Sequence, residues 1–292
     1  MSSGDAGQEP TPIFVLYHYV PSLPAALIFT AILGLSSAAH TWQIVRTKTW
    51  YFIPMLIGVL MEAIGYVGRI MSHYDNMALG PYIMQTLLIL IAPALIAASI
   101  YMILGRLIVM VEGEEYSLVR IKWLTKTFVL GDVVSFLMQS AGGGLMAANY
   151  EMMHTGERII IVGLIVQLLW FGFFIVTSFV FHIRIARSPT SASLRHQAPV
   201  SWKTMLYVLY AASLLIMIRS IFRLVEYIQG NGGYLLRHEA YLYIFDAVLM
   251  SIAVILFNVF HPSKVLVTQP DHKGYTSSTS SNVETYQMVQ GV

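Results

Sequence analysis

Seven ionisable residues lie inside stretches of this sequence that are otherwise long enough and apolar enough to cross a membrane. They are Glu62, Arg69, Asp132, Arg219, Arg223, Glu226 and Asp246. A charge near the centre of a bilayer costs about 2.5–3.5 kcal/mol even on insertion-based scales. A chain that keeps several such charges must satisfy them inside a helix bundle or in a water-filled cavity. We therefore expect the function to depend on this buried polar set.

The composition agrees with a membrane location. The chain has 292 residues, of which 57% are hydrophobic and 11% are charged, whereas soluble domains carry about 25% charged residues. It contains no cysteine, which excludes disulfides, thiol catalysis and cysteine-ligated metals. These features predict an integral membrane protein rather than a nucleic-acid-binding protein.

Seven apolar stretches reach the ~20 residues that a transmembrane helix needs. We place them at 22–43, 50–72, 81–106, 123–148, 157–184, 203–229 and 236–260. No long hydrophilic insert separates them, so the sequence predicts an all-α bundle of seven helices in one membrane domain, residues 22–265. Residues 1–21 form an N-terminal segment before it, and the Ser- and Thr-rich residues 266–292 are predicted to be a disordered tail.

Lysine and arginine are distributed unequally between the two sides of this bundle. They gather in the first, third and fifth connections and in the C-terminal tail, whereas the other side has only Arg158 and Arg237 in its loops. The positive-inside rule then places the N-terminus outside and the C-terminus in the cytosol.

Three of the predicted spans carry polar residues at the spacing i, i+4, i+7, which places each trio on one helix face. The trios are Glu62, Tyr66 and Arg69; Arg219, Arg223 and Glu226; and Glu239, Tyr243 and Asp246. Arg223 is expected to pair with Glu226, and Arg219 with Glu62 or Asp246. Alternatively, pairs such as Glu62 with Arg69 only hold neighbouring helices together.

The fourth span offers a further polar face. Asp132, Ser135 and Gln139 share one side of the predicted helix, and Gly142–Gly144 follow them. Small residues let transmembrane helices approach closely. The glycine run is therefore interpreted as a helix-packing surface rather than a phosphate-binding loop.

Together these residues predict a polar cavity in the outer half of the membrane. The predicted substrate-binding residues are Glu62, Tyr66, Arg69, Asp132, Gln139, Arg219, Arg223, Glu226, Tyr243 and Asp246. Arginines suit phosphate or carboxylate groups, and carboxylates suit an ammonium group. Because both kinds of headgroup occur on amphipathic lipids, the expected partner is a membrane lipid or an amphiphilic small molecule. Protonation of Glu62 or Asp246 offers a way to couple its movement to protons.

The sequence lacks the common signatures of catalysis. It has no H-x3-H pair, no G-x-x-x-x-G-K-[ST] motif and no G-x-S-x-G motif, so no metal, nucleotide or nucleophilic site is indicated. We predict a protein that is not an enzyme and that needs no cofactor.

Motifs in order along the chain resemble the fungal lipid-translocating exporter family, the RTA-like seven-helix proteins. The motifs are Tyr19-x-Pro21-Ser22, Glu62-x-x-Gly65-Tyr66-x-x-Arg69, Ala92-Pro93 with Gly105-Arg106, Asp132-x-x-Ser135-x-x-x-Gln139, Arg219-x-x-x-Arg223-x-x-Glu226, and Glu239 followed by Tyr243-x-x-Asp246 and His261-Pro262. The resemblance covers about residues 17–265. It implies a fungal source, a plasma-membrane location, and a role in the movement of sphingoid bases or in resistance to toxic lipophilic compounds. Other members of that family are tied to porphyrin uptake and to sterol-directed drug tolerance.

Three hypotheses for the function follow. The first is a translocator or exporter of lipids or amphiphiles. The second is a seven-helix sensor or regulator of lipid or drug stress, and the third is an intramembrane lipid hydrolase, which the missing metal ligands disfavour. The glycine-rich faces of the second and fourth spans suit either internal packing or a homo-oligomer.

Overall fold

The computed structural model describes residues 21–75, 78–148, 152–195, 199–230 and 233–266. The predicted N-terminal segment 1–21 and the predicted disordered tail 266–292 therefore lie, apart from one residue each, outside the described residues. Their domain boundaries stay predictions.

Among the described residues, seven helical spans are long and apolar enough to cross a membrane, as the sequence predicted. Six of them are α1 (Leu23–Thr47), α2 (Ile53–Tyr74, preceded by the 3-10 turn Trp50–Phe52), α3 (Leu79–Met110), α4 (Ile121–Ala148), α5 (Met153–Arg187) and α7 (Trp202–Gln229). The short helix α6 (Ser191–Arg195) and the 3-10 turn Glu114–Tyr116 lie in the connections. The helices extend one to four residues past many of the predicted ends, because hydropathy marks the apolar stretch and not the end of the helix.

The seventh span differs from the single regular helix predicted at 236–260. The short helix α8 (Tyr234–Arg237) precedes it, and the span itself, Glu239–Lys264, begins with α9 (Glu239–Leu242). It continues as a π-helical segment, Tyr243–Val248, and ends as α10 (Leu249–Val259) and the 3-10 turn Pro262–Lys264. A π-helical segment has more residues per turn than the α-helix on either side of it, and such segments often lie at functional sites. Periodicity alone did not indicate this local change.

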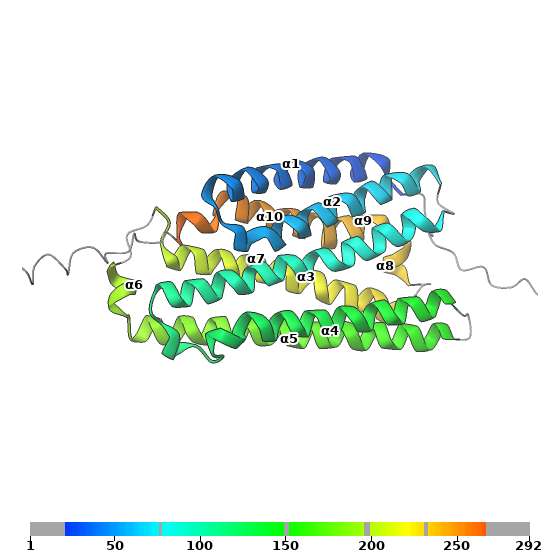
Figure 1. The fold of residues 1–292 in the computed structure, drawn as a ribbon. Coiled ribbons are helices and arrows are strands. Elements are labelled where there is room, and N and C mark those ends of the chain that lie inside the picture. Colours follow the sequence, from blue (N-terminus) through cyan, green and yellow to red (C-terminus); the bar gives the residue numbers. More distant parts are fainter. Residues whose placement is uncertain (1–20, 76–77, 149–151, 196–198, 231–232, 267–292) are drawn as a thin grey trace, which may run out of the picture.

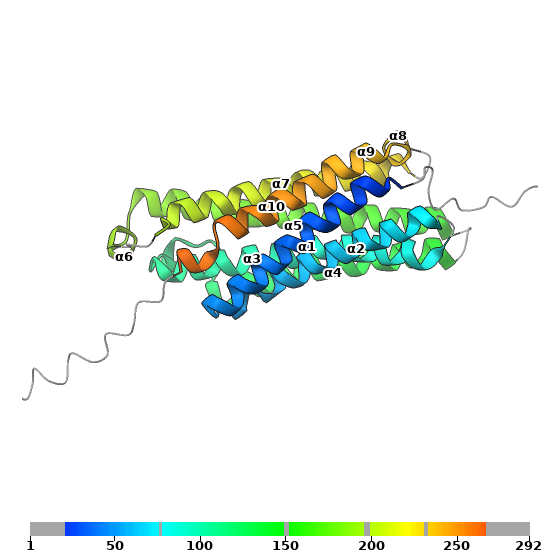
Figure 2. The ribbon, with the colours of Figure 1, turned by 90° about the horizontal axis from the view of Figure 1, so that it is seen from above.

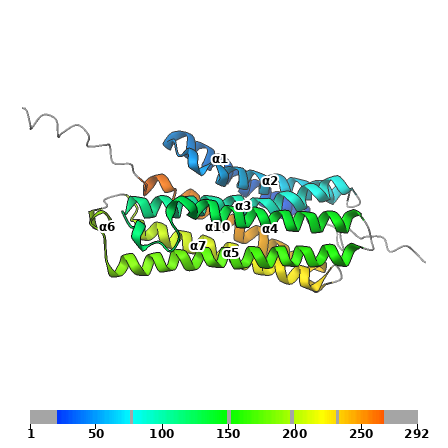
Figure 3. The same cartoon turned by 60° about the horizontal axis from the view of Figure 1, so that its bottom comes forward.

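The spans pack as antiparallel neighbours. Helix α2 lies along α3, and α4 lies along α5, while α7 contacts α3, α5 and α10 (Figure 1). Figure 2 shows α1 crossing obliquely over the bundle, where it contacts α2 and α10. Figure 3 shows α4 and α5 side by side along their length.

The two ends of the bundle can be named from the predicted orientation. The start of α1 marks the predicted outer end, on the right in Figure 1, and α6 marks the predicted cytosolic end, on the left. The structure contains no membrane, so the orientation itself stays a prediction.

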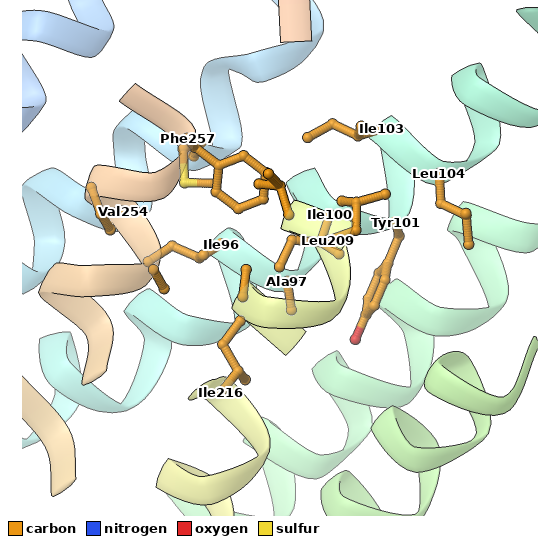
Figure 4. Close-up of a cluster of buried hydrophobic side chains, with 14 of the residues drawn as sticks. Ile96, Ala97, Ile100, Tyr101, Ile103, Leu104, Leu209, Ile216, Val254 and Phe257 are labelled. Atoms are coloured by element: carbon orange, nitrogen blue, oxygen red, sulfur yellow. The ribbon is translucent and has the colours of Figure 1, made fainter. Parts of the chain in front are cut away.

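An apolar core joins α3, α7 and α10 in the half of the bundle toward the predicted cytosolic end. Ile100, Leu104, Leu209, Val254 and Phe257 are at most 1% exposed and lie together there (Figure 4). This packing fixes α7 and the seventh span, which carry Arg219 and Asp246 nearer the predicted outer end, against α3.

Glycines allow the closest helix contacts, as predicted. A Cβ atom added to Gly58 of α2 would lie 2.9 Å from the carbonyl oxygen of Ala92 in α3. One added to Gly142 of α4 would lie 2.6 Å from the carbonyl oxygen of Gly156 in α5. No atom lies within 4 Å of the corresponding position at Gly143. The run Gly142–Gly144 therefore serves helix packing through Gly142.

These contacts give a prediction for the α4–α5 pair. Gly142→Ala should destabilise the protein by about 1–3 kcal/mol, because the added methyl group meets backbone that cannot move aside. The matched control Gly143→Ala should be neutral or stabilising, since alanine favours a helix and meets open space. Thermal unfolding of the two purified variants in the same detergent measures the difference. Equal melting temperatures would contradict the packing described here.

Candidate functional site

Three arginines of the membrane domain, two of them buried and Arg223 partly buried, are each paired with a carboxylate. Arg223 Nη1 lies 2.7 Å from Glu226 Oε2 within α7. Arg219 Nε donates to Asp246 Oδ1, which joins α7 to the π-helical segment. Arg219 Nη2 also donates to the carbonyl oxygen of Ile89 in α3, at 2.8 Å. The predicted pair Arg223–Glu226 is thus confirmed, and of the two partners expected for Arg219, Glu62 or Asp246, the structure shows Asp246.

The third pair corrects the suggested partnership between Glu62 and Arg69. Arg69 Nη2 lies 2.7 Å from Glu239 Oε1, and Arg69 Nε donates to the hydroxyl group of Tyr243 at 3.0 Å. Glu239 also accepts the backbone N–H of Ser22, with 2.8 Å to Oε1. Glu62 and Arg69 lie about 10 Å apart along the axis of α2. Helix α9 brings the carboxylate of Glu239 nearer to Arg69. Glu239 therefore ties the first, second and seventh spans together at the predicted outer end.

Glu62 is left without such a partner. Its side chain is fully buried, and neither carboxyl oxygen has a hydrogen-bond partner among the described residues. It lies in electrostatic contact with Asp246 and Arg219. The hydroxyl group of Tyr66 and Oδ2 of Asp246 are also buried without a hydrogen bond in the described part of the chain. We call Glu62, Tyr66, Arg219 and Asp246 the Glu62 cluster.

The charges around this cluster do not cancel. Arg69, Arg219 and Arg223 are engaged by Glu239, Asp246 and Glu226, and Glu62 remains as a fourth carboxyl group. A buried charge without a counter-charge is costly in a membrane. The arrangement therefore suits a positively charged group, or a proton, beside Glu62.

Aromatic side chains cover the cluster on the side of α1. Phe29 of α1 packs against Tyr66 and Tyr243, with ring centroids 5.9 Å and 5.5 Å apart. The rings of Tyr66 and Tyr243 are themselves 6.2 Å apart. Three spans thus contribute to an aromatic wall next to the buried carboxyl groups.

Asp132 and Gln139 lie in a different part of the bundle. The hydroxyl group of Tyr101 donates to Asp132 Oδ2 at 2.8 Å, between α3 and α4. Gln139 Nε2 donates to Gln167 Oε1 at 3.0 Å, between α4 and α5. The polar stripe of the fourth span therefore contacts α3 and α5 rather than the Glu62 cluster. Substrate binding by these two residues stays a prediction.

Glu239 was missing from the residues that we predicted to bind substrate. It belongs to the same i, i+4, i+7 trio as Tyr243 and Asp246, and that spacing was the available signal. The sequence places Glu239 at the start of the seventh span, next to a predicted loop, whereas in the structure it contacts buried Arg69.

We expect substitution of an ion-paired residue to lower the stability of the protein more than substitution of Glu62. Arg219→Met should destabilise the protein by about 3–5 kcal/mol, because it leaves Asp246 as an uncompensated buried carboxyl group. Glu62→Gln should melt close to the wild type, since no hydrogen bond is lost. Replacing both partners, Arg219→Met with Asp246→Leu, should recover most of the loss.

Thermal unfolding in detergent tests the three variants in parallel. A single Arg219→Met variant as stable as the wild type, or a double variant less stable than the single one, would contradict a structural role for the Arg219–Asp246 pair.

The fold and the buried charges define a class of protein: a polytopic α-helical membrane protein with a polar cluster inside its helix bundle. Comparison with known proteins narrows this class. The family described as "RTA1 like protein" matches residues 55–269, and the chain belongs to this family, which confirms the resemblance seen in the sequence motifs.

The chain is similar to proteins of Saccharomyces cerevisiae, some of which carry names that refer to uptake or transport. The chain is 36% identical to "Protoporphyrin uptake protein 1", over 89% of this chain and 94% of that protein. It is 35% identical to "Protein RTA1", over 85% of each. It is 28% identical to "Sphingoid long-chain base transporter RSB1", over 83% of this chain and 72% of that protein. No solved structure matches the chain.

Proposed function

We propose that this protein moves amphiphiles with a cationic headgroup, such as sphingoid bases, across the bilayer, and that the headgroup binds at the Glu62 cluster. The observation that carries this proposal is the fully buried carboxyl group of Glu62, which has no hydrogen-bond partner among the described residues. Ionisable residues inside membrane spans commonly mark substrate pathways.

The free atoms of the cluster favour a cation over an anion. Within the Glu62 cluster, the buried polar atoms that have no hydrogen bond among the described residues are oxygens of Glu62, Tyr66 and Asp246, although Nε of the neighbouring Arg223 also has none. An ammonium group has three N–H donors and no acceptor, so it matches this set of oxygens. A phosphate or carboxylate group would instead compete with Asp246 and the Ile89 carbonyl for Arg219. Of the two headgroup chemistries left open by the sequence, the contacts therefore favour the ammonium group.

The position of α1 suits the apolar part of such a substrate. Helix α1 lies on the outside of the bundle and presents exposed apolar residues, among them Leu27, Ile28 and Leu35. Phe29 on the same helix reaches inward to the aromatic wall. A hydrocarbon chain would remain in lipid beside α1 while its headgroup enters between α1, α2 and the seventh span.

The names of the similar proteins support transport rather than catalysis. One is named as a transporter of sphingoid long-chain bases, which are amphiphiles with an amine headgroup, and another as an uptake protein. A plasma-membrane location, a contribution to resistance and the absence of enzymatic activity form part of the proposal. The oligomeric state stays open.

Glu62→Gln should reduce the movement of a fluorescent sphingoid base in proteoliposomes by about tenfold or more, because the headgroup loses a charge-assisted hydrogen bond of ~1.5–3 kcal/mol. The control is Glu115→Gln, which changes an exposed carboxylate in a loop and should move the base at the wild-type rate. A fluorescent phosphatidylglycerol analogue, which has an anionic headgroup, should move little with any of the three proteins.

The same assay with and without a pH gradient tests proton coupling.

If wild-type protein moves the anionic lipid as fast as the base, or if Glu62→Gln is fully active, the proposal of a cationic headgroup site at Glu62 is wrong. Measurable binding of the base without any movement would favour the sensor hypothesis.

A further inference from the structure

We propose that a second headgroup site, formed by uncharged polar side chains, lies between α1 and α10, toward the predicted cytosolic end. We call its residues the α1–α10 seam: Ser36, His40 and Gln43 of α1, Ser251 and Asn258 of α10, and His261. This inference rests on the proposed function, because it gives the translocated headgroup a second binding position. The seam is defined by buried polar atoms that the structure leaves unpaired.

Two amide side chains fix the orientation of the seam. Gln43 Nε2 donates to the backbone carbonyl oxygen of Asn258 at 2.8 Å. Asn258 Nδ2 donates to Ser36 Oγ. Because the nitrogen of each amide is engaged, Gln43 Oε1 and Asn258 Oδ1 are the free ends, and both are buried without a hydrogen bond in the described residues. The seam therefore presents two free acceptors.

Two histidines and a serine add to these acceptors. His40 and His261 are at most 1% exposed, and both pack against the ring of Phe52, with centroids 5.6 Å and 5.3 Å away. His261 Nδ1 accepts the backbone N–H of Ser263 at 3.3 Å, whereas its Nε2 has no hydrogen bond. The ring of His40 lies near the backbone of Val254, and neither of its nitrogens has a hydrogen bond that meets the distance and angle limits among the described residues. Ser251 Oγ is also buried without a hydrogen bond.

Such a concentration of unpaired atoms is not explained by helix packing. In hydrocarbon, a buried polar group without a hydrogen bond costs free energy that an apolar side chain of similar size would not. A polar ligand that enters the seam would satisfy these atoms. The free acceptors suit a headgroup with N–H or O–H donors, which is the chemistry of an ammonium or hydroxyl group.

The seam continues the path from the Glu62 cluster. Ser251 follows Asp246 by five residues, or about 7 Å along the helix axis. Asn258 and His261 then lead to the predicted cytosolic end. Helix α1 borders both sites, with Phe29 at the aromatic wall and His40 in the seam. A headgroup that leaves the Glu62 cluster would therefore reach the α1–α10 seam next.

The cysteine-free sequence permits a direct test. Ser251→Cys places a thiol in the seam, and Ser220→Cys is the matched control: Ser220 is 7% exposed against 5% for Ser251, and it donates to the Ile216 carbonyl oxygen in α7. Both variants are reconstituted full-length and treated on both sides with a small cationic methanethiosulfonate reagent that does not cross membranes. The probe ligand is sphinganine, an amine with two hydroxyl groups.

Ser251→Cys should react at least about tenfold faster than Ser220→Cys, because a polar seam that admits a headgroup also admits water and small cations. Sphinganine should slow its modification several-fold. The same protection should persist in the variant that also carries Glu62→Gln, since the seam binds the headgroup independently of the charged site.

The outcomes separate this inference from the proposed function. No reaction at Ser251→Cys, reaction without protection by sphinganine, or protection that is lost with Glu62→Gln would each overturn the second site. If protection is intact but wild-type protein moves no sphingoid base, the seam stands as a binding site and the proposed transport fails.

Discussion

The Arg219–Asp246 ion pair is the interaction on which the arrangement of the central spans depends. It joins α7 to the π-helical segment of the seventh span, and the same guanidinium group donates to the carbonyl oxygen of Ile89 in α3. Breaking one side of a buried pair leaves an uncompensated charge, so these three spans cannot separate at this level without a new partner for each group. The apolar core of α3, α7 and α10 holds the same three helices toward the predicted cytosolic end.

Against this fixed centre, the polar contacts of α1 lie at the predicted outer end and at the seam. Glu239 binds both Arg69 of α2 and the backbone N–H that precedes α1. Nearer the middle, α1 meets its neighbours through the ring of Phe29 and through the incompletely paired seam. Rearranging α1 would break the Ser22–Glu239 hydrogen bond and the hydrogen bonds of the seam, but no ion pair of the described residues. This makes α1 the natural side for access to Glu62.

The sequence predicted the spans and which face of each helix is polar, but not which faces meet. The trio Arg219, Arg223 and Glu226 was enough to predict the Arg223–Glu226 pair, because both residues belong to one helix and the spacing determines their contact. Pairing between helices requires the relative rotation of two spans, which one sequence does not provide. For this reason the sequence left two candidate partners for Arg219 and did not indicate Glu239 as the partner of Arg69. It also grouped Asp132 with the residues of the Glu62 cluster, whereas in the structure Asp132 contacts Tyr101. The π-helical segment was also beyond periodicity analysis, since it alters the period itself.

The contrast between a charged and an uncharged site has a physical consequence for transport. A carboxyl group that binds a cation tightly in hydrocarbon also holds it back, since leaving exposes an unpaired charge again. A neighbouring set of neutral acceptors lowers that cost, because part of the hydrogen bonding is restored before the headgroup reaches water. Gln43, Asn258 and the two histidines provide such acceptors without adding a fixed negative charge. Selection of the headgroup would then depend on Glu62, and the rate of its release on the seam.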